Sequence, residues 1–337
     1  MSDTGAAASG MPARARERRA ERGPSTVRVQ VPATSANLGP AFDCAGLALT
    51  CHDDVEFTVA ESGLDVVVAG EGAGRLPTGE EHLVVRAFRA AGAELGWSPP
   101  GLRVAAHNRI PQGRGMGSSA AAVVAGVLAA WSLCPDVDVV DGDAVLRLAT
   151  EMEGHPDNVA ACLVGGVTLT WEAEHGPVAD SIDVHPEVLP VVLVPPATLS
   201  TELARGLLPD AVPHADAAFN AGRAALLVHA LTREPGLLLA ATEDRLHQQQ
   251  RRAAMPDSLA LVDRLRAAGH AAVVSGAGPS VLVLARSRPD DPAGDAAAAV
   301  GVREITDLTP RGWTVLPLEV DHRGASVLSA ASEVSSS

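Results

Sequence analysis

No charged residue stands between Arg114 and Asp136, and the segment between them is rich in alanine and valine. Such a stretch either crosses a bilayer or lies in a folded core, since about 20 apolar residues span the hydrocarbon layer. This one opens with GMGSSAAA, is poor in Leu, Ile and Phe, and has no basic cluster beside it. We therefore expect a buried helix that begins near Ser118.

The segments on either side of this helix alternate between strand and helix patterns, which indicates a mixed fold. In the first half, strands are expected at 25–33, 54–61, 64–70, 102–108 and 164–172, and helices at 80–95, 142–154 and directly after HPDN. In the second half, strands are expected at 189–196, 271–276, 280–286 and 313–320, and helices at 202–208, 215–232, 235–244 and 258–268. The second half is typical of a ferredoxin-like layer, with a domain boundary near 185–190.

The overall charge limits the partners of this chain. The formal net charge is −15, which argues against nucleic acid or an anionic membrane as a partner. Aromatic residues make up only 2% of the chain, and tyrosine is absent. The core must therefore consist mainly of Ala, Val and Leu.

Cysteine and histidine patterns predict no disulfide framework and no metal held by protein ligands alone. The cysteines form no C-x-x-C pair, and we expect free, mostly buried thiols in a reducing cytoplasm at Cys44, Cys51, Cys134 and Cys162. Residues 1–25 and 323–337 are expected to be disordered tails, and no apolar segment follows the arginine-rich start as a secretory signal would require.

The stretch PQGRGMGSSA at 111–120 has the composition of a phosphate-binding loop. It is not a P-loop, because that motif needs a lysine and this chain has none. The dinucleotide fingerprint fits weakly, through Gly115, Gly117 and Ala120, with no strand directly before it. Glycines let backbone N–H groups approach an oxyanion, and the helix start adds its unpaired N–H groups and positive dipole end. Charge neutralisation would then fall to Mg²⁺ and arginine, with Ser118 and Ser119 supplying hydroxyl groups.

Three further polar segments accompany the loop, at 31–49, 151–167 and 275–283. Each alone has an ordinary structural explanation, as an Asx-turn, a helix cap or a hairpin turn. Their joint occurrence favours a ligand site.

With these segments the chain resembles the GHMP small-molecule kinases, and within them the homoserine kinase family. The central loop has the form P-x-x-x-G-[LM]-G-S-S-A-A, and the patterns VPATSANLGPGFDxxGLAL, EGHPDNVAPxLxGG, STxxAR, FNxGRAALLVxAL and SGAGPS recur nearly verbatim at 31–49, 153–166, 200–205, 219–231 and 275–280. The resemblance covers about residues 26–320. It implies an α+β fold of two domains: an N-terminal, ATP-binding domain like domain 2 of ribosomal protein S5 (26–187) and a ferredoxin-like C-terminal domain (188–322), with the ligands in the cleft between them.

The resemblance also implies a reaction: transfer of the γ-phosphate of ATP to the side-chain hydroxyl of L-homoserine, with Mg²⁺, in threonine biosynthesis, by a homodimer. By motif, the triphosphate would lie on Pro111, Gly113, Arg114, Gly115, Met116, Gly117, Ser118, Ser119 and Ala120. The amino acid would be held by Asn37, Asp43, His155, Thr201, Arg205 and Arg251. Asp43 would bind its ammonium group and the two arginines its carboxylate, which a guanidinium fits bidentately.

The catalytic roles follow from the same motifs. Ser119 and Glu151 would hold Mg²⁺, with Glu153 as a competing candidate, and Asn158 would lie beside the hydroxyl and the γ-phosphate. No dedicated general base is expected, since phosphoryl transfer depends mainly on positioning and electrostatics. Asp157 is either a base or, as we favour, a structural cap.

Three positions depart from the family pattern. Ala41 replaces a glycine, His82 replaces an asparagine in the segment beside the adenine, and QQQR at 248–251 replaces EPYR. Two other functions stay open at this point: a GHMP kinase for a different alcohol, and a catalytically silent member that senses a ligand.

Overall fold

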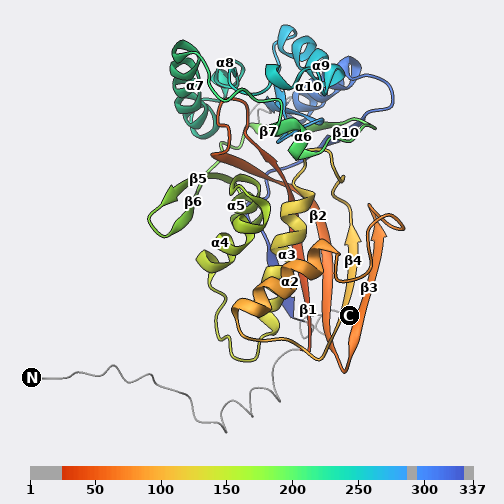
Figure 1. Cartoon of the computed structure of the whole chain (residues 1–337). Helices are drawn as coiled ribbons and strands as arrows, with labels where there is room; N and C mark the ends of the chain where they lie inside the picture. Colours follow the sequence, from red (N-terminus) through yellow and green to blue (C-terminus); the bar gives the residue numbers. More distant parts are fainter. Residues whose placement is uncertain (1–24, 287–293, 330–337) are drawn as a thin grey trace, which may run out of the picture.

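The computed structural model describes residues 25–286 and 294–329. It contains two sheets, each covered by helices (Figure 1). The larger sheet has the order β11-β1-β2-β4-β3, with β5 and β6 branching from β2. Its strands are β1 (Thr26–Ala36), β2 (Ala45–Ala60), β3 (Gly63–Gly70), β4 (Gly101–Asn108), β5 (Val167–Ala173), β6 (Gly176–Ile182) and β11 (Ser326–Ser329).

Helices α2, α3 and α4 lie together on one face of this sheet, and α5 lies at the end nearer the smaller sheet (Figure 1). They span α2 (Leu83–Glu94), α3 (Ser118–Leu133), α4 (Gly142–Glu153) and α5 (Asp157–Val164). Among the strand pairs of the described ranges, only β3 and β4 are parallel, with α2 as the connection between them.

The smaller sheet has the antiparallel order β10-β7-β9-β8, and its larger helices lie on the side turned away from the first sheet (Figure 1). Its strands are β7 (Val188–Val194), β8 (Ala271–Val274), β9 (Val281–Arg286) and β10 (Thr314–Pro317). Its helices are α6 (Thr201–Arg205), α7 (His214–Thr232), η1 (Pro235–Leu237), α8 (Leu238–Ala241), η2 (Gln249–Arg251), α9 (Pro256–Ala267) and α10 (Gly294–Leu308). The chain passes from the larger sheet to the smaller one between β6 and β7, at residues 183–187.

Helix α3 is the uncharged segment, and the prediction that it is buried is confirmed. Its small residues let α2 pack closely, because a Cβ at Gly126 would lie 2.7 Å from Ala87 Cβ and collide with the Val84 carbonyl oxygen. The core consists mainly of Val, Ala and Leu, as the composition predicts. None of the helices in the described ranges is long and apolar enough to span a membrane.

The structure differs from the sequence-based expectation at several elements. Strand β11 lies inside the segment expected to be a disordered tail, so that prediction is wrong for Ser326–Ser329. These residues pair with the edge of β1, a contact between the two ends of the chain that a local pattern cannot reveal. Strand β6 and helix α10 were not expected, and β2 begins at Ala45. The structure also describes Ser25 and residues 323–325 of the expected tails, and the backbone N–H groups of Arg323 and Gly324 donate to Asp321. Residues 1–24 and 330–337 lie outside the described residues. All four cysteines are free thiols.

Candidate active site

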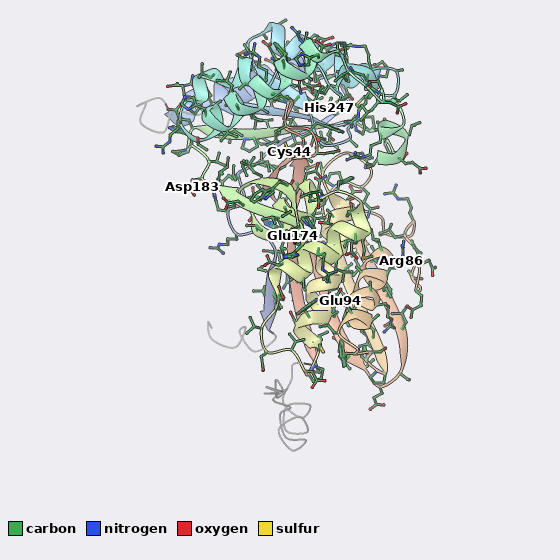
Figure 2. All side chains as sticks on the ribbon, turned by 60° about the vertical axis from the view of Figure 1, so that its left-hand side comes forward. Cys44, Arg86, Glu94, Glu174, Asp183 and His247 are labelled. Atoms are coloured by element: carbon green, nitrogen blue, oxygen red, sulfur yellow. The ribbon has the colours of Figure 1, made fainter. Side chains whose placement is uncertain are left out.

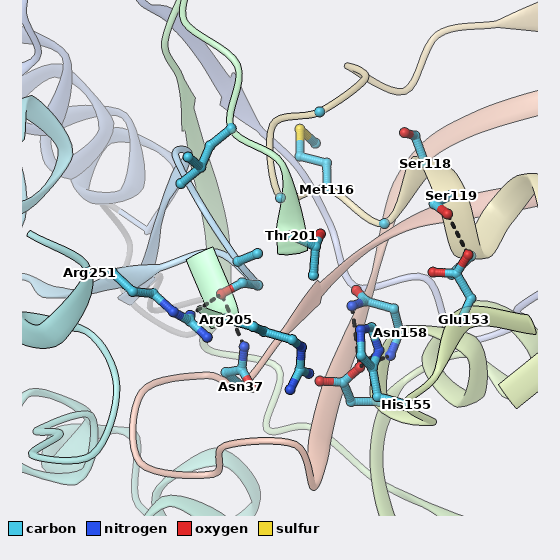
Figure 3. Close-up of a pocket in the computed structure, with 18 residues that line it drawn as sticks. Asn37, Met116, Ser118, Ser119, Glu153, His155, Asn158, Thr201, Arg205 and Arg251 are labelled. Carbon is cyan, nitrogen blue, oxygen red and sulfur yellow. Dashed lines mark hydrogen bonds and ion pairs between the residues drawn. The ribbon is translucent and has the colours of Figure 1, made fainter. Parts of the chain in front are cut away.

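A cavity opens where segments of both sheets meet (Figure 3). Its walls are the loop after β1, the glycine loop with the first turn of α3, the starts of α5 and α6, and the turn between β8 and β9. Most of the expected site residues line it: Asn37, Gly113, Gly115, Met116, Gly117, Ser118, Ser119, Ala120, His155, Asn158, Thr201, Arg205 and Arg251. The fold therefore brings these separate motifs to one place.

The glycine loop runs from β4 to α3 and is held at both ends. At its start, the Asp53 carboxylate accepts two backbone N–H groups of the turn after β4, at 2.6 and 2.9 Å. At its end, Gly117 has a φ of 68°, and a Cβ there would collide with the Thr34 hydroxyl. The Thr34 backbone N–H donates to the Met116 carbonyl at 3.1 Å. Only glycine fits at this last position.

The N-terminus of α3 has the properties of an anion site. No side chain caps it, and its first turn contains no acidic residue. The first N–H groups of a helix have no partner within the helix, and the macrodipole places partial positive charge there. Phosphate oxygens are the groups that such a terminus binds well.

Glu153, at the end of α4, is the acidic neighbour of this terminus. The Ser119 hydroxyl donates a hydrogen bond to Glu153 Oε1 (Figure 3). Burial raises the pKa of the Glu153 carboxyl, although the Ser119 hydrogen bond acts in the opposite direction. A partly buried carboxylate with a hydroxyl beside it suits a hard cation.

Glu151, which the motif comparison favoured as the partner of Ser119, lies elsewhere. Its side chain is 61% exposed and accepts a hydrogen bond from Arg147 at 3.1 Å. Glu151 therefore does not lie beside Ser119, whereas the competing candidate Glu153 does. Side chains two residues apart in an α-helix point in directions that differ by about 200°, so Glu151 and Glu153 face opposite sides of α4.

The start of α5 carries a linked set of polar groups. Asp157 is buried, and its Oδ1 accepts the Asn158 backbone N–H at 2.7 Å and lies 3.3 Å from His155 Nδ1. The interaction with Asp157 raises the pKa of His155, against the effect of burial. The Thr34 hydroxyl donates to Asn158 Oδ1 at 2.7 Å and so orients its amide. Thr34 was not among the expected site residues; its only sequence signal was its place in the VPATSAN segment.

The loop after β1 has an unusual backbone. Asn37, Leu38 and Asp43 have φ values of 71°, 44° and 57°, in the left-handed region, which costs about 1–2 kcal/mol per non-glycine residue. The Asn37 side chain holds this shape: its Oδ1 accepts the Asp43 N–H at 2.9 Å, and its Nδ2 donates to the Gly276 carbonyl at 3.0 Å. Strain of this kind is found where function requires a particular geometry.

Two guanidinium groups approach each other at this end of the cavity. Arg205 donates to both carboxylate oxygens of Asp43, at 3.0 and 2.6 Å. Arg251 is 1% exposed and donates to the Gly276 carbonyl at 3.3 Å. Each guanidinium carbon lies 5.5 Å from the centroid of the Phe42 ring. Burial, and then the nearby Arg205 charge, lower the pKa of Arg251 to about 10. An anionic group is the natural partner for this pair.

Two expected triphosphate contacts, Pro111 and Arg114, lie outside this cavity and line another one between the sheets. The Arg114 guanidinium donates to the carbonyl oxygens of Gln112, Pro195 and Pro196, at 3.0 to 3.2 Å. The Arg114 side chain is therefore engaged with these carbonyl groups and does not line the first cavity, and its expected contact with the triphosphate stays a prediction.

A second cavity adjoins the first and shares Ser118 and Ser119 with it. Apolar side chains line much of it, including Val55 and Leu83. His82 also lines it, is 3% exposed, and has no hydrogen-bond partner for either ring nitrogen among the described residues. Burial lowers the pKa of His82, so its ring is neutral at pH 7. The cavity is therefore largely apolar, and the buried imidazole of His82 lies in its wall.

Comparison with known proteins agrees with this geometry. Residues 82–166 match the family described as GHMP kinases N terminal domain, and residues 218–303 match GHMP kinases C terminal. A homoserine kinase of Streptomyces avermitilis is 55% identical over 310 residues, which cover 91% of this chain and 97% of the relative. A homoserine kinase of Streptomyces coelicolor is 53% identical, with 91% and 96% covered.

Among solved structures, the crystal structure of homoserine kinase from Cytophaga hutchinsonii matches with a TM-score of 0.77 and 26% identity, covering 90% of this chain and 98% of that one. The α+β fold with a GHMP N-terminal and a GHMP C-terminal domain, which the motifs predict, is confirmed.

Proposed function

The chain belongs to the GHMP kinases, and within them to the homoserine kinases, and from this premise we propose how its residues transfer the γ-phosphoryl group of ATP to the side-chain hydroxyl of L-homoserine. One observation supports the assignment of roles. The cavity has a cationic end, with Arg205 and Arg251, and an anion-binding end at the start of α3, with Asn158 also in its wall. The product, O-phospho-L-homoserine, serves threonine biosynthesis.

The triphosphate lies on the glycine loop and the start of α3. The second cavity takes the adenine, because it opens from Ser118 and Ser119 and is largely apolar. The aromatic base then lies against apolar side chains, and a ring nitrogen of His82 gains a hydrogen-bond partner. No lysine is needed, since backbone N–H groups and the helix dipole face the phosphate oxygens.

Mg²⁺ would be held by Glu153 and Ser119, together with phosphate oxygens. No group of three or more His, Cys, Asp or Glu side chains in the described ranges could hold a metal alone. That fits Mg²⁺, which is commonly bound by one or two carboxylates plus substrate phosphates. When bound, the ion neutralises charge that develops on the transferred group.

The amino acid occupies the end with the two arginines. Its ammonium group pairs with Asp43, and its carboxylate pairs with Arg205 and Arg251. Both arginines are preformed there, and Asn37 holds the loop that carries Asp43. His155, at the start of α5, and Thr201, on α6 with Arg205, also contact the substrate. A neutral sugar offers no charged group to either side of the Arg205–Asp43 ion pair, which favours a zwitterionic substrate.

The hydroxyl oxygen attacks the γ-phosphorus in line, the bond to the ADP oxygen breaks, and the hydroxyl proton leaves late to phosphate or water. Asn158, oriented by Thr34, aligns the hydroxyl with the phosphate. Asp157 is committed to the Asn158 N–H and to His155, which supports a structural role for it. Positioning of this kind accounts for much of the rate in phosphoryl transfer.

A coupled assay of ADP release with L-homoserine, L-serine, L-threonine and mevalonate tests the proposal. L-Homoserine should give the highest kcat/KM by at least tenfold. Preference for mevalonate would indicate a different GHMP kinase, and binding of nucleotide without any turnover would indicate a sensor. The homodimer stays a prediction of the family resemblance, and analytical ultracentrifugation of the full chain checks it.

A further inference from the structure

His247 lies in the C-terminal layer, in the segment between α8 and η2 (Figure 2). It is fully buried and contacts two segments of the substrate end of the cavity. Its Nε2 is 2.7 Å from the Gly39 carbonyl oxygen, in the strained loop after β1. Its Nδ1 is 3.2 Å from Arg251 Nη1, one helical turn further along the chain. A single imidazole therefore joins the two substrate-binding segments.

The chemistry of these partners determines the state of the ring. A guanidinium can only donate, so Nδ1 must accept and cannot carry a proton. A carbonyl oxygen can only accept, so the proton is on Nε2. Burial lowers the pKa of His247, and the Arg251 charge acts in the same direction. The ring is therefore neutral at pH 7 in the one tautomer that satisfies both neighbours.

Arg251 has few other groups to orient it. Its Nη1 contacts the Gly276 carbonyl and His247, and its Nε has no partner within the described part of the chain. Beside it are Phe42, whose ring centroid lies 4.9 Å from that of His247 with the rings tilted by 31°, and the repelling charge of Arg205. A guanidinium next to a like charge needs a fixed acceptor to hold its direction.

His247 is itself held by the turn before it. Asp244 accepts the backbone N–H groups of residues 246 to 248, at 2.9 to 3.2 Å, and its Oδ2 lies 3.8 Å from His247 Nε2. Asn220 of α7 donates to the same carboxylate at 3.1 Å. The imidazole thus rests on a rigid support.

We propose that His247 is a positioning residue for the kinase reaction: it fixes the direction of the Arg251 guanidinium and ties it to the Gly39 loop, so that the site for the substrate carboxylate is preformed. This inference rests on the proposed function, since it takes Arg251 to be a carboxylate ligand. His247 touches neither substrate nor phosphate in this arrangement. Substitution of His247 should therefore change KM for L-homoserine and leave KM for ATP and kcat nearly unchanged.

Two substitutions separate the two contacts. His247→Asn places an amide oxygen near the position of Nδ1, so it keeps an acceptor for Arg251 but does not reach Gly39. His247→Gln reaches toward Gly39 with its terminal amide but has no acceptor at the Nδ1 position. His175→Gln, in the exposed turn between β5 and β6, is the matched control. For all four proteins, KM for L-homoserine, KM for ATP and kcat are measured, with thermal melting as the check on folding.

We expect His247→Gln to raise KM for L-homoserine about tenfold or more, since a hydrogen bond to a charged group contributes about 1.5–3 kcal/mol. Its KM for ATP and its kcat should stay within about twofold of the wild type, and His247→Asn should recover most of the loss. Equal rises in both KM values, an unchanged KM for L-homoserine, or a larger defect in His247→Asn than in His247→Gln would each overturn the inference.

If His247→Gln does not fold, His247→Asn decides alone: a KM change larger for ATP than for L-homoserine contradicts the inference, and the reverse supports it. If the wild-type enzyme does not phosphorylate L-homoserine, both the proposed function and this inference are wrong. If the wild-type enzyme phosphorylates L-homoserine but the two His247 variants have the same KM values as the wild type, only the inference is wrong.

Discussion

Arg205 donates two hydrogen bonds to Asp43, at 3.0 and 2.6 Å, and so pairs the two groups assigned to opposite ends of an amino acid. A zwitterion can replace each half of this ion pair: its ammonium group takes the place of the guanidinium at Asp43, and its carboxylate takes the place of Asp43 at Arg205. The exchange preserves the number of charge contacts. A neutral alcohol offers neither group and leaves the ion pair closed.

Arg205→Gln should raise KM for L-homoserine by about 10- to 100-fold, because two charge-assisted hydrogen bonds to the substrate carboxylate are lost. KM for ATP should change by less than about twofold. Initial-rate kinetics with each substrate varied in turn checks this, with Arg103→Gln as the control, since Arg103 forms an exposed ion pair with Asp65 on the surface of the larger sheet. Equal effects of the two substitutions would refute the assignment of Arg205.

Glu153→Gln should lower kcat by about 10²- to 10³-fold and raise the Mg²⁺ concentration needed for half-maximal rate, since the carboxylate beside Ser119 is the proposed ion ligand. Glu151→Gln, two residues earlier on the same helix, should remain within about twofold of the wild type, since that side chain only pairs with Arg147 on the surface. Magnesium titrations of the steady-state rate distinguish the two. The reverse order of defects would restore Glu151 as the ligand.

The same carboxylate should reduce the stability of the ligand-free protein at neutral pH. Burial raises the pKa of Glu153 above its ordinary value, so the folded state binds more protons than the unfolded state between these two pKa values. Stability therefore falls as pH rises through that window, and the loss is complete above it. Melting curves without Mg²⁺ should show Glu153→Gln more stable than the wild type at pH 7.5, with the difference shrinking toward pH 4.5. A difference independent of pH would contradict this.

Asp157→Asn should lower kcat by less than about 10²-fold, because a general base contributes about 10²–10⁴-fold and none is proposed here. The remaining loss reflects a weaker contact with His155 and less exact placement of Asn158. The measurement is kcat at saturating substrates, with KM values as the check on binding. A fall of several orders of magnitude with unchanged KM values would falsify the mechanism without a base.

His82→Leu should raise KM for ATP by about tenfold and leave KM for L-homoserine unchanged, if a ring nitrogen bonds the base. The ligand-free variant should melt no lower than the wild type, since a buried polar group without a partner costs about 1–3 kcal/mol. Nucleotide titration by calorimetry, together with melting curves, tests both parts. A variant that loses stability but binds ATP normally would show that His82 only fills space.

Much of the fold could be predicted because its signals are local. The lack of charge between Arg114 and Asp136 predicts a buried helix, and the glycines before it predict a close backbone approach at the helix start. The ends of the helices and strands were harder to predict. Strand β11 was missed because a four-residue strand depends on pairing with β1 at the other end of the chain. The motifs also located the site, since the family resemblance ties each of them to one cavity.

The sequence by itself determined which residue types meet at the site: glycine and serine for phosphate, arginine and aspartate for a zwitterion, and carboxylates near the helix start. Only the tertiary structure decided which member of each set lies where. Helical phase and the position of α3 bring Glu153, and not Glu151, next to Ser119, and carbonyl groups of a distant segment bind the Arg114 guanidinium. The contact between His247 and Gly39 joins segments 208 residues apart in the chain, whereas its other partner, Arg251, lies one helical turn away. These contacts depend on how segments far apart in the chain are oriented in space, and a local sequence pattern does not specify that orientation.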